Sequence, residues 1–188
     1  MTAAELHPVL AGGAYRAYVY AYPHKTAYRP LAPVALRDVW ADEPQRHLFL
    51  YVHVPFCTMR CGFCNLFTTP NPRRDLVTFY LDALRRQAEA VRGALPGARF
   101  ARLALGGGTP TYLSADELAE VFDLAERVMG ADPRAIPTGV EVSPDTLTPE
   151  KVALLKARGV ERVSIGVQSF VEAEAANSGR PQRRAEVD

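Results

Sequence analysis

The chain has 188 residues, of which 48% are hydrophobic and 23% are charged, an ordinary composition for a globular protein. Lys and Arg number 22 against 21 for Asp and Glu, so the net charge of +1 gives no electrostatic case for a nucleic acid or a membrane surface as partner. The first residues do not resemble a signal peptide, and no apolar run approaches the length of a membrane span. We therefore expect a cytoplasmic protein with a single main domain.

Residues 1–47 are predicted to form an N-terminal arm that packs over a main domain of residues 48–188. Five of the eight tyrosines fall in this arm, and Tyr18–Tyr22 alternates with a period of two, which is typical of a short strand or an extended segment. Pro23, Pro30 and Pro33 limit regular structure after it.

From residue 48 onwards, apolar runs alternate with segments of helical periodicity. The first run is continuous and ends at a proline, which predicts a strand buried on both faces. The predicted strands are Leu48–Val54, Ala101–Leu105, Pro137–Val142 and Glu161–Val167. Four successive strand–helix units predict an α/β fold with a parallel sheet in which the helices are the crossover connections.

Four helices are predicted to follow these strands. A capping box, Ser114 with Glu117, opens the second helix, and Thr148 followed by Pro149 opens the third. The predicted bounds are Leu76–Arg92, 115 to about 130, 149–159 and a fourth helix that starts over Val171–Ala176.

The residues that could bind a ligand or a metal fall at the ends of the four predicted strands. A cysteine-rich loop follows the first strand, Gly106–Gly108 follows the second, Glu141 lies at the end of the third and Gln168 at the end of the fourth. The carboxyl ends of parallel strands share one edge of the sheet, and four of them span roughly 14–15 Å at about 4.8 Å per strand. Free backbone groups of the glycines, the Glu141 carboxylate and the Gln168 amide would suit one elongated ligand with amino, carboxylate and hydroxyl groups.

The three cysteines of the chain, Cys57, Cys61 and Cys64, lie within eight consecutive residues. Three thiols cannot pair into disulfides without leaving one over, and a reducing compartment favours metal ligands. Zinc in closed structural sites takes four protein ligands, and His53 is the candidate fourth, although its place in an apolar strand favours a packed or hydrogen-bonded role. An iron–sulfur cluster bound by only three cysteines keeps one iron open for a small molecule. A buried trio without a metal is the remaining alternative.

Together these motifs resemble the coproporphyrinogen III oxidase-like branch of the radical S-adenosylmethionine (SAM) superfamily. The similarity covers roughly residues 48–182. It is carried by the cysteine spacing and by four segments: Tyr51–Cys57 (YVHVPFC), Gly106–Leu113 (GGGTPTYL), Gly139–Pro144 (GVEVSP) and Arg162–Phe170 (RVSIGVQSF). The resemblance implies a partial (β/α) barrel, with four βα units present of an expected six.

The resemblance also implies the cofactors and the residues that hold them. Cys57, Cys61 and Cys64 would ligate a [4Fe–4S] cluster whose open iron binds SAM, and reductive cleavage of SAM would generate a 5′-deoxyadenosyl radical. SAM contacts are expected from Tyr51, Gly107 and Glu141, and contacts to a second SAM molecule from Phe63, Gly108, Thr109, Gln168 and Arg180.

The implied partners are a small-molecule substrate, with a tetrapyrrole or haem as the candidate, and an electron donor such as flavodoxin or ferredoxin. Leu66 stands where the oxidases of this branch have a further cysteine, which favours the haem chaperones of the branch or its members of less certain chemistry over the oxidases. The competing function is a haem carrier that turns over no substrate. Because only four strands are predicted, we expect an open sheet edge and little catalysis from these 188 residues alone.

Overall fold

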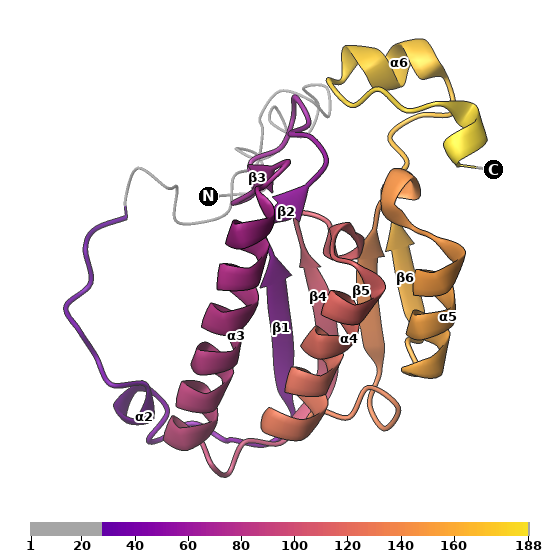
Figure 1. Ribbon diagram of the computed structural model, residues 1–188. Helices are drawn as coiled ribbons and strands as arrows, with labels where there is room; N and C mark the ends of the chain where they lie inside the picture. The colour runs from indigo at the N-terminus through magenta and orange to yellow at the C-terminus, as the bar shows by residue number, and fades with distance from the viewer. Residues whose placement is uncertain (1–27, 188) are drawn as a thin grey trace, which may run out of the picture. The chain divides into compact units, whose positions relative to one another are not determined.

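The computed structural model describes residues 28–187 (Figure 1). The predicted strand at Tyr18–Tyr22 lies outside the described residues. The chain divides into two compact units after Val34, and the second unit, Ala35–Asp188, contains the sheet and all the helices described below. The boundary predicted between an arm and a core at residue 48 stays a prediction.

The predicted parallel sheet is confirmed. It consists of β1 (Leu48–Val54), β4 (Phe100–Gly107), β5 (Thr138–Val142) and β6 (Arg162–Ile165), in the order β1-β4-β5-β6, and each neighbouring pair is parallel. A second, two-stranded parallel pair, β2 (Phe56–Cys57) with β3 (Thr69–Pro70), brackets the cysteine loop. The sequence of strand, helix and next parallel strand is that of an open βα barrel segment.

Helices cover one face of the four-stranded sheet (Figure 1). These are α3 (Arg74–Ala94), α4 (Ala115–Asp123) and α5 (Pro149–Ala157), while α6 (Glu172–Asn177) lies beyond the carboxyl ends of the strands. The smaller elements are α2 (Leu36–Val39) and the short helical turns η2 (Pro110–Tyr112), η4 (Pro144–Thr146) and η5 (Arg184–Glu186).

The prediction that the first strand is buried on both faces is wrong. Val52 and Val54 are buried, but Phe49 and Tyr51, which point to the opposite face, are 60% and 49% exposed. The cause is the one-sided helix layer: α3 and α4 pack on the face of Val52 and Val54, together with Leu105 and Val140 of the next strands, and the other face is the inner wall of the barrel segment. A continuous apolar run cannot distinguish these two situations.

The predicted helix starts are confirmed by their caps. Ser114 Oγ accepts from the backbone N–H of Glu117, and the Glu117 carboxylate accepts from the N–H of Ser114, which is the expected capping box. Thr148 Oγ1 likewise accepts from the N–H of Lys151, with Pro149 in the first helical turn. After Asp123, the second helix continues as a π-helical segment, Leu124–Val128, and terminates at Gly130 with φ of +74°.

The fourth strand is shorter than predicted, since β6 ends at Ile165 instead of Val167. The N–H of Gly166 still bonds to the carbonyl of Val142 at 3.0 Å, after which the chain leaves the sheet. All four residues of β6, which lies at one edge of the sheet, are exposed. The shortening moves Gln168 away from the strand end.

Candidate active-site cleft

A cleft of about 410 Å³ lies at the carboxyl ends of the strands. Nine of the residues singled out from the sequence line it: Cys57, Cys61, Phe63, Cys64, Gly107, Gly108, Thr109, Glu141 and Arg180. Two others do not. Tyr51 lies on the inner face of β1, three residues before the end of the strand at Val54. Gln168 is exposed and lies outside the cleft.

The cysteine loop forms one wall of the cleft. All three cysteines are free thiols of intermediate burial, and a turn closed by the Cys64 N–H and the Cys61 carbonyl (3.1 Å) brings the second and third together. Burial raises the pKa of the Cys57 thiol, and the nearby Thr109 hydroxyl and Arg180 guanidinium act in the opposite direction. The Thr109 hydroxyl lies 3.6 Å from the Cys57 sulfur and donates to it.

The glycine loop after β4 runs directly beside the cysteine loop. The N–H groups of Gly108 and Thr109 donate to the carbonyls of Val54 (2.8 Å) and Phe56 (2.7 Å). These backbone hydrogen bonds hold the glycine loop beside the segment that leads into the cysteine loop. A Cβ on Gly108 would lie 2.6 Å from the Phe56 carbonyl oxygen and 2.9 Å from the Cys57 sulfur. Only glycine permits so close an approach of the Gly108 backbone to Phe56 and Cys57, and the missing side chain leaves space next to the Cys57 sulfur.

Glu141 faces the glycine loop from β5. Its Oε2 accepts from the N–H of Gly107 at 3.2 Å, and its other carboxylate oxygen makes no hydrogen bond within residues 28–187, so it can bind ligand hydroxyl or amino groups. Gly106 provides the room, since a Cβ there would lie 2.8 Å from Glu141 Oε2 and 3.1 Å from the Tyr51 ring. Burial and, to a lesser degree, the Glu141 charge raise the pKa of Tyr51, which keeps its hydroxyl protonated as a donor.

Gly107 combines a positive φ of +111° with close contact to a side chain. A Cβ at this position would lie 2.7 Å from the His53 ring. We expect Gly107→Ala to lower the free energy of unfolding by about 1–3 kcal/mol, because the residue must adopt a strained backbone or displace the ring. Gly93→Ala is the matched control: it lies in α3 with no atom within 4 Å of the added Cβ, so stability should be unchanged or slightly increased. Urea unfolding of the two variants checks this, and equal stability would remove the strain argument.

His53 is held by two hydrogen bonds on its own ring. Its Nε2 lies 2.9 Å from the carbonyl oxygen of Phe67, which can only accept, so Nε2 carries the proton and Nδ1 accepts from the Tyr51 hydroxyl at 3.1 Å. The expectation of a hydrogen-bonded strand histidine is confirmed. Both ring nitrogens are therefore occupied, which weakens the alternative of a zinc site with His53 as the fourth ligand.

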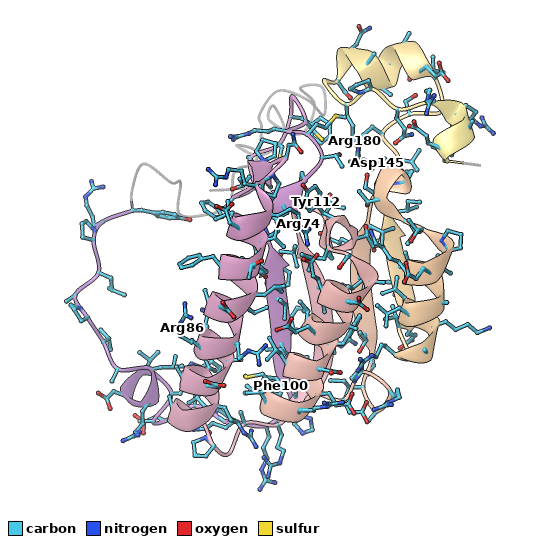
Figure 2. The ribbon with its side chains drawn as sticks, viewed as in Figure 1. Arg74, Arg86, Phe100, Tyr112, Asp145 and Arg180 are labelled. Atoms are coloured by element: carbon cyan, nitrogen blue, oxygen red, sulfur yellow. The ribbon has the colours of Figure 1, made fainter. Side chains whose placement is uncertain are left out.

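A polar network that the sequence did not point to ties the cysteine loop to the sheet. The Asp145 carboxylate accepts from Thr58 Oγ1 at 2.8 Å and from the Ser143 hydroxyl, which in turn accepts from the Arg180 guanidinium at 2.8 Å. Figure 2 shows Asp145 and Arg180 facing the same region beyond the strand ends. Only Arg180 was singled out from the sequence. Thr58 and Asp145 are 87 positions apart, and only the fold brings them together.

Glycines also place Arg180 in the cleft. A Cβ on Gly166 would lie 2.9 Å from its guanidinium, so the absence of a side chain at Gly166 gives the arginine its position. The backbone of Gly179 passes the backbone of Gly62 so closely that a Cβ on Gly179 would lie 2.7 Å from the Gly62 nitrogen. The segment after α6 is thereby packed against the cysteine loop.

The donor set of the cleft fits an iron–sulfur cluster. Three cysteine sulfurs, which are soft donors, lie on one wall. The backbone of Gly108 adjoins the first of them, and the Thr109 hydroxyl donates to that sulfur. Within residues 28–187, no three His, Cys, Asp or Glu side chains are grouped closely enough to hold a single metal ion. A cluster binds each cysteine through a different iron, so its thiolates need not converge on one point.

Comparison with known proteins shows the family of the chain. The model of the radical SAM superfamily matches residues 51–187. The heme chaperone HemW of Bacillus subtilis (strain 168) is 33% identical over 137 residues, which are 73% of this chain and 36% of that protein. The oxygen-independent coproporphyrinogen III oxidase of Cereibacter sphaeroides (strain ATCC 17025 / ATH 2.4.3) is 35% identical over 172 residues, which are 85% of this chain and 37% of that protein.

A solved structure shows the same fold. The coproporphyrinogen III oxidase (HemN) from Escherichia coli, described as a radical SAM enzyme, aligns with a TM-score of 0.77 and 28% identity over 90% of this chain and 39% of that chain. The chain belongs to the radical SAM superfamily. Its resemblance to the coproporphyrinogen III oxidase-like branch is confirmed, and it spans little more than a third of the length of the relatives described above. No described helix is long and apolar enough to cross a membrane.

Proposed function

We propose that the cleft binds a [4Fe–4S] cluster through Cys57, Cys61 and Cys64 and holds SAM between the cluster and the strand ends. The observation that carries this proposal is the position of three free cysteines on one wall of the cleft that contains Glu141 and the glycine loop. Residues 48–188 would form the core that supports this site. When bound and reduced, the cluster would supply the electron that cleaves SAM to a 5′-deoxyadenosyl radical.

The protein's own contribution is binding and orientation. Gly107 and Gly108 expose backbone next to the cysteines, and the free carboxylate oxygen of Glu141 would accept from an amino or hydroxyl group of SAM. Tyr51, whose hydroxyl proton is donated to His53, would contact SAM as a hydrogen-bond acceptor or through its ring, from the inner face of β1. Phe63, Thr109 and Arg180 line the same cleft and remain candidates for contacts to a second SAM molecule, whereas Gln168 would need to move to reach it.

The proposed reaction is hydrogen abstraction from a small molecule, with a tetrapyrrole as the candidate because relatives carry the name of coproporphyrinogen III oxidases. A flavodoxin or ferredoxin would supply the electron, and the cytoplasm would be the compartment. The second candidate is a haem chaperone without turnover. It is favoured by a relative named a heme chaperone and by Leu66, which is 50% exposed at the position where the oxidases of this branch have a further cysteine.

The formation of 5′-deoxyadenosine tests the enzymatic proposal. Anaerobically reconstituted protein, mixed with SAM and a strong reductant, should release 5′-deoxyadenosine, which chromatography measures. A titration of the same protein with haem, in which absorbance measures haem binding, tests the second candidate. Binding of haem without any 5′-deoxyadenosine would favour the chaperone, and the absence of both would contradict the proposal.

A further inference from the structure

The backbone ladder between β4 and β5 stops before the two strands reach the cleft. Its last paired residues are Leu105 and Val140, which directly precede the glycine loop and Glu141. The N–H groups of Gly108 and Thr109 donate instead to carbonyls of β1 and β2, on the cysteine side of the cleft. Strand pairing therefore anchors the glycine loop on that side, but it does not set the distance between this loop and Glu141.

A pair of buried hydroxyls joins the turns that follow these two strands. Thr111 lies in η2, just after the glycine loop, and Thr146 lies in η4, just after β5; the two residues are 0% and 8% exposed. Their hydroxyl oxygens are 2.7 Å apart. Thr146 Oγ1 donates its proton to the carbonyl of Ser143 at 3.1 Å, so it accepts from Thr111 Oγ1. This bond holds η2 against η4.

Lys151 of α5 joins the same two turns a second time. Its Nζ donates to the carbonyl of Thr111 at 2.5 Å and to the carbonyl of Thr146 at 3.0 Å. The residue lies in the first turn of α5, where a positive charge opposes the helix dipole, and burial lowers the pKa of its ammonium group. Both effects disfavour a lysine at this position, and its hydrogen bonds to two separate turns offset them.

We infer that Lys151 is a positioning residue that sets the distance between the glycine loop and Glu141, the two sides of the proposed SAM site. This inference rests on the proposed function. Lys151 is not among the residues that line the cleft, so it acts through η2 and η4. The bond from the Gly107 N–H to Glu141, at 3.2 Å, spans the two sides and should weaken first when the Lys151 bonds are lost.

Isothermal titration of the reconstituted protein with SAM tests this role. Lys151→Met removes the donor and should weaken SAM binding roughly tenfold at unchanged iron content, the size expected for a residue that acts through others. In the Glu141→Ala background the same change should cost less than about threefold, because the distance that Lys151 sets no longer matters. Lys156→Met makes the same substitution at an exposed position of α5 and should bind SAM as the wild type does.

Amide hydrogen exchange, measured by NMR on the protein without a cluster, gives a readout that does not depend on SAM. The Gly107 N–H should exchange at least about threefold faster in Lys151→Met than in the wild type. The N–H groups of Gly108 and Thr109, which bond to β1 and β2, should stay within about twofold of the wild type. Thr111→Val removes only the hydroxyl bond between the turns and should give the same pattern with smaller changes, so it decides the question if Lys151→Met fails to fold.

Several outcomes would overturn the inference. Wild-type SAM affinity in Lys151→Met, or an equal loss in the presence and absence of Glu141, would show that Lys151 does not act on this distance. Equal acceleration of all three amides would show a general loosening of the fold instead. If the wild type bound no SAM, the proposed function would fail, while the exchange rates would still decide whether Lys151 holds the glycine loop against Glu141.

Discussion

Replacing any one of Cys57, Cys61 or Cys64 with Ala is expected to abolish cluster assembly. Anaerobic reconstitution of the wild type with iron and sulfide should give close to four irons per chain and broad visible absorption, as a [4Fe–4S] cluster does. The chain contains no further cysteine that could substitute for a lost ligand, so each single variant should retain little iron. Colorimetric iron and sulfide analysis, together with the absorption spectrum, measures this.

The control for this experiment lies within the same loop. Arg60 is exposed and has no sulfur, so Arg60→Ala should reconstitute like the wild type. A cysteine variant that still held four irons would show that its sulfur is not a ligand. Stoichiometric zinc without iron uptake by the wild type would replace the cluster with a structural zinc site.

The second large effect is expected at Glu141. Glu141→Ala should weaken SAM binding by about 1.5–3 kcal/mol, the cost of losing a hydrogen bond to a charged group, which corresponds to roughly 10- to 150-fold in the dissociation constant. Isothermal titration of the reconstituted protein with SAM provides the measurement. The variant should keep its iron content, because Glu141 lies on β5 and outside the cysteine loop.

Glu141→Gln refines this prediction. Glu141 also holds the glycine loop, since its Oε2 accepts from the Gly107 N–H at 3.2 Å. A glutamine side-chain oxygen can accept the same bond. If the loss in Glu141→Ala came only from a displaced glycine loop, Glu141→Gln would bind SAM as the wild type does. We expect instead an intermediate loss, because the amide no longer offers a charged acceptor to the ligand. Unchanged affinity in Glu141→Ala would remove this residue from the site.

The sheet and its polarity could be predicted from the sequence because local signals agreed with the global pattern. The run Leu48–Val54, the caps at Ser114 and Thr148 and the alternation of strand and helix each have a local cause. Placement of the cysteines, the glycines and Glu141 at one edge followed from parallel topology alone. These residues therefore gather in one cleft as expected.

What could not be predicted depends on tertiary packing. The open face of β1 follows from helices on one side only, which no strand pattern encodes. β6 ends at Ile165, earlier than predicted, and Gln168 lies outside the cleft. The Thr58–Asp145 bond joins segments far apart in the chain and has no local signature.

The most direct test of the account is electron paramagnetic resonance of the reduced, reconstituted protein with and without SAM. An open iron that binds SAM predicts a signal from a reduced [4Fe–4S] cluster whose shape and g values change when SAM is added. The change should depend on SAM concentration and should require higher concentrations in Glu141→Ala. A cluster signal that SAM does not alter, or reconstituted protein without a cluster signal, would contradict the assignment of this cleft as a SAM-binding cluster site.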